Sequence, residues 1–266
     1  MLETWVILSY LCLGAFVGFF AGLLGIGGGG IIVPVLTSLF LAQQFPFESV
    51  VHLALASSMT SIIFTSISSI RSHHQHAAII WPIVFKISPG IALGTFSIAY
   101  LVAFIPTKPL AIIFAIFMAF ISIQMLLNKK PKPSRDIPRP IILSLVGAFI
   151  GAISALVAIG GGSLSVPFMT WCNVNLKNAI ATSSAIGFPI ALMGALGYWV
   201  GGTQQSNLPE FSSGFIYWPA VLLISSVSVL TAPLGVKMAH KLPVLLLKRI
   251  FAALLMALSI KMLTSI

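Results

Sequence analysis

The sequence predicts an all-α polytopic membrane protein built from two inverted repeats of about five segments each. Of the 266 residues, 58% are hydrophobic and only 7% are charged, whereas a soluble domain carries about 25% charged residues. The apolar residues gather into ten segments, and a glycine-rich motif occurs twice, near the start of each half of the chain. Lipid is therefore the predicted solvent around most of this protein.

The apolar segments, in chain order, divide evenly between the two halves. They lie at about 5–25, 30–42, 49–70, 78–103, 108–127, 141–159, 163–173, 178–200, 215–236 and 245–265. The second and seventh segments are short, and a helix from 163 to 173 rises only about 16 Å against a hydrocarbon core of ~30 Å. We expect broken or half-helices at the glycine motifs, with irregular backbone deep in the membrane, where it must be buried in protein or line a polar cavity.

The two halves resemble each other along their whole length. Residues 14–36 align without a gap with residues 147–169, and 11 of these 23 positions are identical. Further matches are Ala56-Ser57-Ser58 with Thr182-Ser183-Ser184, Trp81-Pro82 with Trp218-Pro219, and Ser122 with Ser259. We therefore predict a first transmembrane repeat at 1–128, a basic, proline-rich cytoplasmic linker at 129–140 and a second repeat at 141–266. An odd number of crossings per repeat inverts one repeat relative to the other.

The charged loops predict the orientation in the membrane. If all ten segments cross and both termini lie outside, most basic residues fall on the cytoplasmic side, as the positive-inside rule requires. These residues are Arg71, Lys129, Lys130, Lys132, Arg135, Arg139, Lys177, Lys237, Lys241, Lys248 and Arg249. A rival topology makes 30–42 and 163–173 re-entrant and leaves eight crossings, but it divides the basic residues almost equally between the sides. Because the net charge of +10 is spread over short loops, we expect no nucleic-acid partner.

The glycine runs are the candidate substrate site. They are Gly27, Gly28 and Gly29 in the first copy and Gly160, Gly161 and Gly162 in the second. Glycine allows positive φ and close approach of the backbone to a ligand, and a helix that starts after the run presents free N–H groups and a positive dipole end. Two such ends would cradle a small anion, with Ser163 capping its helix or binding the ligand.

Other glycines and prolines in these segments are expected to have structural roles. Gly14, Gly18 and Gly22 have the spacing of small residues at ordinary helix contacts in membranes, and we interpret them as packing. Pro34 and Pro167, which follow the glycine runs, are expected to be structural helix breaks.

Neutral hydroxyl groups form the second part of the candidate site. Ser57 and Ser58 in the first half, and Thr182, Ser183 and Ser184 in the second, suit an oxyanion that must be bound and then released. The alternative is that these hydroxyls bond to backbone carbonyls four residues earlier or to neighbouring helices. Lys177, at a predicted cytoplasmic edge, would attract the anion before it enters.

Chemistry that the sequence lacks also restricts the function. The four acidic residues lie in termini or loops, so no carboxylate is expected at the membrane midplane, where a cation or proton relay usually keeps one. We find no enzyme motif and expect no cofactor and no metal. His52 lies at the start of a segment, and a proton-coupled importer that uses His52 as its proton carrier remains an alternative.

The motif Gly22-LLGIGGGGIIVPV-Leu36 and its echo Ala158-IGGGSLSVP-Phe168, followed by Thr182-Ser-Ser, resemble the TauE/SafE family of sulfite exporters. This resemblance implies a multi-pass carrier in the bacterial inner membrane for small sulfur-containing anions such as sulfite or organosulfonates, with the two glycine triplets on the substrate path. We therefore expect a secondary transporter that exports a small oxyanion by alternating access between its repeats. A non-transporting scaffold subunit is the alternative from another class, and the oligomeric state, including a homodimer, stays open.

Overall fold

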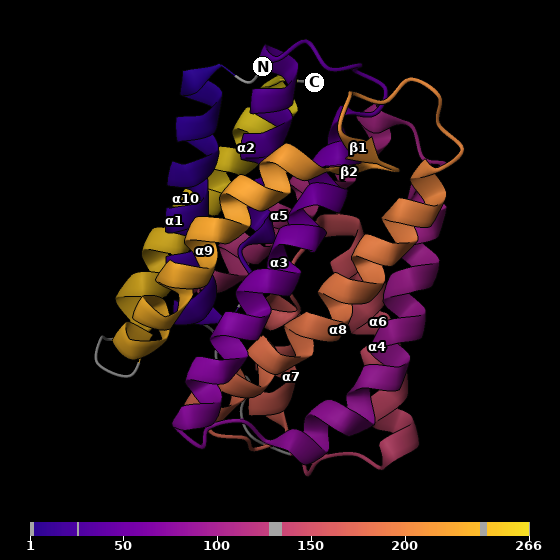
Figure 1. The fold of residues 1–266 in the computed structure, drawn as a ribbon. Helices are drawn as coiled ribbons and strands as arrows, with labels where there is room; N and C mark the ends of the chain where they lie inside the picture. Colours follow the sequence, from indigo (N-terminus) through magenta and orange to yellow (C-terminus); the bar gives the residue numbers. More distant parts are fainter. Residues whose placement is uncertain (1–2, 26, 128–134, 240–243, 266) are drawn as a thin grey trace.

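The computed structural model describes residues 3–25, 27–127, 135–239 and 244–265 (Figure 1). Within these ranges the chain forms ten helices and one short β-hairpin. The helices are α1 (Thr4–Leu24), α2 (Gly29–Ala42), α3 (Val50–Gln75), α4 (Trp81–Val102), α5 (Thr107–Leu127), α6 (Pro140–Val157), α7 (Gly162–Trp171), α8 (Leu176–Gly202), α9 (Trp218–Ala239) and α10 (Val244–Ser265). Seven of the described helices are long and apolar enough to cross a membrane, which confirms the predicted all-α polytopic class.

The helices α1 and α2 form a hairpin that enters and leaves the bundle at the same end. The side-chain amide of Gln43, at the end of α2, donates a hydrogen bond of 2.9 Å to the hydroxyl of Tyr10 near the start of α1. The helices α6 and α7 form the matching hairpin from the opposite end, where the guanidinium of Arg135 lies 5.0 Å from the ring centre of Trp171. The other six helices each run between the two ends of the bundle (Figure 1).

These hairpins correct the predicted topology of ten crossings. Each pair of predicted crossings is replaced by one hairpin whose tip lies inside the bundle, and three helices of each repeat run from end to end. The number remains odd, and the repeats remain inverted. The glycine runs lie inside the bundle and not at its ends, as expected for irregular backbone deep in the protein.

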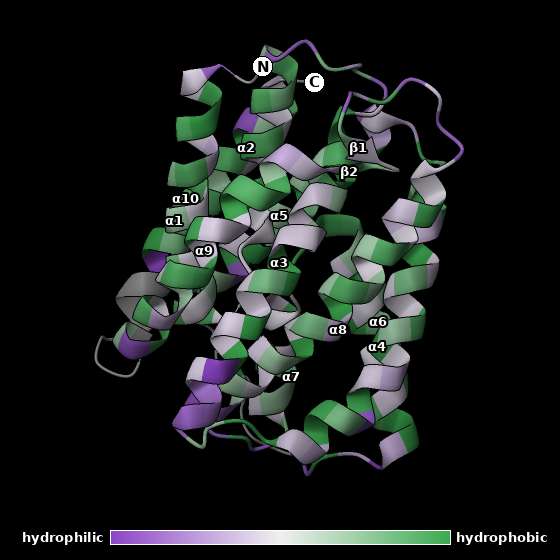
Figure 2. Cartoon of the chain, in the orientation of Figure 1, coloured by the Kyte–Doolittle hydropathy of each residue, from purple (hydrophilic) through white to green (hydrophobic). Residues whose placement is uncertain are grey.

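Charged residues still separate between the two ends of the bundle. Arg71, Arg139, Lys177 and Lys237 lie at one end, which we call the basic end. Lys108 lies at the opposite end with both termini. Figure 2 shows strongly hydrophilic residues near the ends and mainly apolar residues along the sides. Of the basic residues predicted to be cytoplasmic, Lys129, Lys130, Lys132 and Lys241 lie outside the described residues, as does much of the predicted linker.

The predicted glycine ladder packs one repeat against the other. Gly14, Gly18 and Gly22 of α1 lie against α9, and a Cβ at Gly22 would collide with the backbone of Ala232. Gly147 of α6 lies against α4 in the same manner. Because each repeat places its first helix beside the fourth helix of the other repeat, the two halves interlock. The packing interpretation of this ladder is confirmed.

A reciprocal pair of hydrogen bonds marks the pseudo-two-fold relation between the repeats. The Ser122 hydroxyl of α5 donates to the Ala252 carbonyl of α10 at 2.7 Å. The Ser259 hydroxyl of α10 donates to the Ala115 carbonyl of α5, also at 2.7 Å. The two serines were matched by the sequence duplication, and the structure places them on the two sides of one antiparallel helix contact.

The predicted segment boundaries differ from the helices at a few instructive places. Helix α3 continues to Gln75, beyond the predicted end at 70. The prediction followed the apolar residues, and the last turn of this helix is polar. A small hairpin of β1 (Ser212–Ser213) and β2 (Ile216–Tyr217) precedes α9. Pro34 and Pro167 lie inside α2 and α7, so they are not the helix breaks; the breaks fall at the glycine runs before them.

Candidate functional site

The tips of the two hairpins are built on left-handed backbone. Helix α1 ends at Gly25 with φ 68°, and α2 begins after Gly28 with φ 78°. In the second repeat α6 ends at Ala158 with φ 46°, and α7 begins after Gly161 with φ 79°. Residues with a Cβ rarely adopt this region, so glycine at three of these four positions allows each chain to reverse within a few residues.

The two tips touch each other inside the bundle. A Cβ on Gly27 would lie 2.7 Å from the Cα of Gly160, and a Cβ on Gly29 would collide with the carbonyl of Ala158. Such backbone-to-backbone contact requires residues without side chains. The structure therefore brings together the two glycine triplets that the sequence singled out.

Each tip leads into the N-terminus of a half-helix. The first N–H groups of α2, from Gly29, and of α7, from Gly162, have no acceptor within their own helix, and the positive dipole end lies there too. Ser163 does not cap α7, since the N-cap is Gly161. Within the described part of the chain, the buried hydroxyls of Ser163 and Ser58 have no hydrogen-bond partner. The Ser58 oxygen lies 3.1 Å from the position of a Cβ on Gly29.

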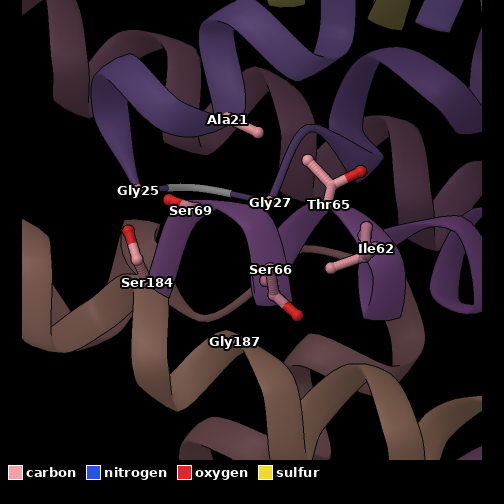
Figure 3. Close-up of a pocket in the computed structure, with 10 residues that line it drawn as sticks. Ala21, Gly25, Gly27, Ile62, Thr65, Ser66, Ser69, Ser184 and Gly187 are labelled. Carbon is pink, nitrogen blue, oxygen red and sulfur yellow. The ribbon is translucent and has the colours of Figure 1, made fainter. Parts of the chain in front are cut away.

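A small cavity lies where the tips meet α3 and α8 (Figure 3). Its volume of about 10 Å³ is enough for about one water molecule. Its lining residues are Ala21, Gly25, Gly27, Ile62, Thr65, Ser66, Ser69, Gly160, Ser184 and Gly187. This space is too small for an oxyanion such as sulfite, which is larger than one water molecule.

Two of the predicted hydroxyls do not line this cavity and bind backbone groups instead. The Thr182 hydroxyl accepts a hydrogen bond of 3.0 Å from the N–H of Ile80, just before α4. The Ser57 hydroxyl accepts one of 3.0 Å from the N–H of Tyr217, just before α9. These bonds are equivalent in the two repeats, and they hold the entry of one helix against α3 or α8.

The other two hydroxyls of α8 lie at the hairpin tip. Ser183 donates to the Gly25 carbonyl at 3.3 Å and receives a hydrogen bond of 2.8 Å from Ser165. Ser184 donates to the Ile180 carbonyl at 3.2 Å and lines the cavity. The structure therefore places only Ser184 of the predicted hydroxyls in the cavity wall.

Three further hydroxyls line the cavity and were not among the predicted residues. They are Thr65, Ser66 and Ser69, all on α3. Ser61, Thr65 and Ser69 recur every four residues along this apolar helix, which places them on one helix face. This hydroxyl stripe is the signal in the sequence for Thr65 and Ser69, and it does not include Ser66.

Lys177 and His52 both lie outside the cavity lining. Lys177 is exposed at the basic end, on the first turn of α8. His52 is buried near the opposite end, with its Nε2 atom 3.2 Å from the Val102 carbonyl and 3.0 Å from the Ile105 carbonyl. Its ring stacks on Phe215 at 4.9 Å. His52 therefore fastens the start of α3 to the end of α4.

Two larger cavities open at the ends of the bundle. At the basic end, a cavity of about 460 Å³ lies between α3 and α9, and Arg71 and Lys237 line it. Its other polar lining residues are Ser68, Ser72, Gln75 and His76. At the opposite end, a cavity of about 790 Å³ is lined by Glu3 and Glu210, among other residues. The two vestibules thus carry charges of opposite sign.

Inverted repeats with broken helices that meet at a small polar cavity are typical of membrane transporters. The family model for the sulfite exporter TauE/SafE matches residues 10–262, and the chain belongs to this family. It is 36% identical to a probable membrane transporter protein of Haemophilus influenzae over 96% of this chain and 97% of that protein.

More distant relatives carry similar names. A probable membrane transporter protein of Methanocaldococcus jannaschii is 27% identical over 87% of this chain and 86% of its own length. The YdhB protein of Bacillus subtilis, also named a probable membrane transporter protein, is 26% identical over 91% and 93%. No solved structure matches the chain.

Proposed function

We propose that this transporter exports small sulfur-containing oxyanions, with sulfite as the first candidate, by alternating access between its two repeats. The observation that carries the proposal is the meeting of two half-helix N-termini inside the bundle. Such ends bind anions through backbone N–H groups and the helix dipole. The family supports a sulfur oxyanion as the substrate.

The donors that would hold the anion are neutral. They are the N–H groups at the starts of α2 and α7 and the hydroxyls of Ser58 and Ser163, which are buried and have no partner among the described residues. A buried lysine would bind an anion more tightly but would also release it slowly. Neutral donors instead suit a carrier that must load and unload in each cycle.

The small cavity leaves no room for the anion in this conformation, so transport would require the tips to move apart. Gly27 and Gly29 meet the backbone of Gly160 and Ala158, so a relative shift of the repeats would separate these contacts. Opening toward the basic end would expose the tips to the vestibule of Arg71 and Lys237, and opening the other way would expose them to the vestibule of Glu3 and Glu210.

The vestibule charges favour loading of the anion from the cytoplasm if the basic end is cytoplasmic, as the positive-inside rule predicts. The anion would be attracted at the basic vestibule and repelled from the acidic one. An exported charge gains about 2.3 kcal/mol per 100 mV when the inside is negative. A divalent anion gains about twice that, which supports a concentration ratio of about a thousandfold without a coupling ion.

The test is sulfite flux in proteoliposomes under an imposed membrane potential, with equal pH on both sides. We expect flux to follow the potential and to fall about tenfold in S58A and in S163A, since a hydrogen bond to a charged ligand contributes about 1.5–3 kcal/mol. S225A is the matched control, because Ser225 is another buried serine whose hydroxyl has no partner in the described part of the chain. Flux that ignores the potential, or equal flux in all three variants, would overturn the proposal.

A further inference from the structure

The small cavity at the hairpin tips has a chemical character of its own. Four hydroxyl side chains line it: Thr65, Ser66 and Ser69 from α3 and Ser184 from α8. The rest of the wall is glycine backbone and the side chains of Ala21 and Ile62. No residue that lines this described cavity carries a charge.

Three of the four hydroxyls direct their protons away from the cavity. Ser66 donates to the Ile63 carbonyl at 2.8 Å, and Ser184 donates to the Ile180 carbonyl at 3.2 Å. Thr65 bonds to a carbonyl of its own helix at 3.1 Å and to a hydroxyl of α9 at 2.7 Å. A hydroxyl has one proton and two lone pairs, so these three groups offer lone pairs to the cavity.

The fourth hydroxyl and the nearby helix end add to this character. Ser69 is only 3% exposed, and its hydroxyl has no partner among the described residues. Figure 3 shows the oxygens of Ser69 and Ser184 beside Gly25, where α1 ends. A helix C-terminus carries the negative end of the dipole, so backbone and side chains together form an electronegative, acceptor-rich wall.

We propose that this cavity binds one Na⁺ ion. Hard monovalent cations take hydroxyl and carbonyl oxygens, and transporters with broken helices bind them at half-helix C-termini. An anion is excluded by the lone pairs and by the volume of about 10 Å³. A divalent cation would lack a carboxylate to balance its charge, and a proton would lack a titratable group.

The cation would lie next to the proposed anion site without depending on it. Gly27 lines the cavity, and Gly28 is the N-cap of α2, so one glycine run separates the acceptor-rich cavity from the donor-rich helix start. The same holds in the second repeat, where Gly160 lines the cavity before α7. The binding test below therefore uses no sulfite.

The experiment measures binding of ²²Na⁺ to the purified full-length protein and its thermal unfolding midpoint. We expect one bound Na⁺ per chain. We also expect the unfolding midpoint to be about 2–4 °C higher in NaCl than in choline chloride of equal ionic strength, because a ligand that binds the native state stabilises that state. S69A should abolish the Na⁺-specific rise, and S225A, outside the cavity, should keep it.

The outcomes separate this inference from the proposed function. Equal midpoints in NaCl and choline chloride, with no bound ²²Na⁺ on the wild-type protein, would mean that the cavity holds water only and would overturn the Na⁺ site. Intact sulfite flux in that case would leave the proposed function standing. Bound Na⁺ without sulfite flux would support the cation site and count against the anion proposal alone.

Discussion

At the scale of single residues, glycine serves two different needs at the hairpin tips. Gly28 and Gly161 adopt positive φ, which turns the chain before α2 and α7. Gly29 has no positive φ but lies against the Ala158 carbonyl, so its role is close backbone contact. The two needs predict different responses to alanine, because one is conformational and the other is steric.

We predict that G29A destabilises the protein by at least about 3 kcal/mol, the upper part of the range for overpacking. The added methyl would collide with the Ala158 carbonyl, which is backbone and cannot turn aside. G194A is the matched control, since its methyl would meet the flexible side chain of Met59 at 3.1 Å, and we expect a loss below about 1 kcal/mol. The measurement is thermal unfolding in detergent, and equal midpoints for the two variants would contradict the tight tip contact.

The sequence singled out the glycines that meet at the tips, but it did not show which hydroxyls line the cavity beside them. The aligned triplets pair Ser57 with Ser183, whereas the structure gives Ser57 the same role as Thr182, because each binds the N–H before a crossing helix. A shift of one residue between two helices is invisible when the neighbouring residues are all small or hydroxylated. The cavity hydroxyls of α3 were missed because membrane helices often carry serine and threonine that bond to their own backbone.

At the scale of elements, the segment boundaries were predictable and the path of the chain was not. Apolar length and glycine position locate each helix within a few residues. The charge pattern could not separate ten crossings from two hairpins, since a hairpin and a pair of crossings return the chain to the same side. Every loop outside the tips therefore has the same side in both topologies. Only the positions of the tips distinguish them.

Cysteine labelling at a tip tests the hairpin topology. In a chain with Cys12 and Cys172 replaced by alanine, we expect I159C to stay unreactive toward a membrane-impermeant maleimide from either side, because Ile159 is 3% exposed. The ten-crossing topology instead places residue 159 in an external loop. Q205C, in the exposed loop after α8, should react readily and serves as the control. Rapid labelling of I159C in the folded protein would contradict the hairpin.

At the scale of the whole molecule, the pseudo-two-fold relation makes the two halves equivalent in backbone but not in charge. The hairpins, the glycine ladders and the Ser122 and Ser259 hydrogen bonds follow the symmetry. The vestibules do not, since one is lined by Arg71 and Lys237 and the other by Glu3 and Glu210. A symmetric carrier with asymmetric entrances can open equally well in both directions and still favour loading of an anion at one end.

The effect of the basic vestibule should be kinetic. We expect R71Q and K237Q each to raise the sulfite KM about two- to fivefold for entry from the basic end at low ionic strength. The kcat should change little, because the surface charge concentrates the anion at the entrance and does not contact it at the tips. About 0.5 M salt should remove the difference, since the Debye length is then shorter than the vestibule. K261Q, at the other end of the bundle, is the control and should leave this KM unchanged. Flux measured with the basic end facing the sulfite solution provides the test, and a salt-independent KM equal in all variants would show that the vestibule charges do not recruit the anion.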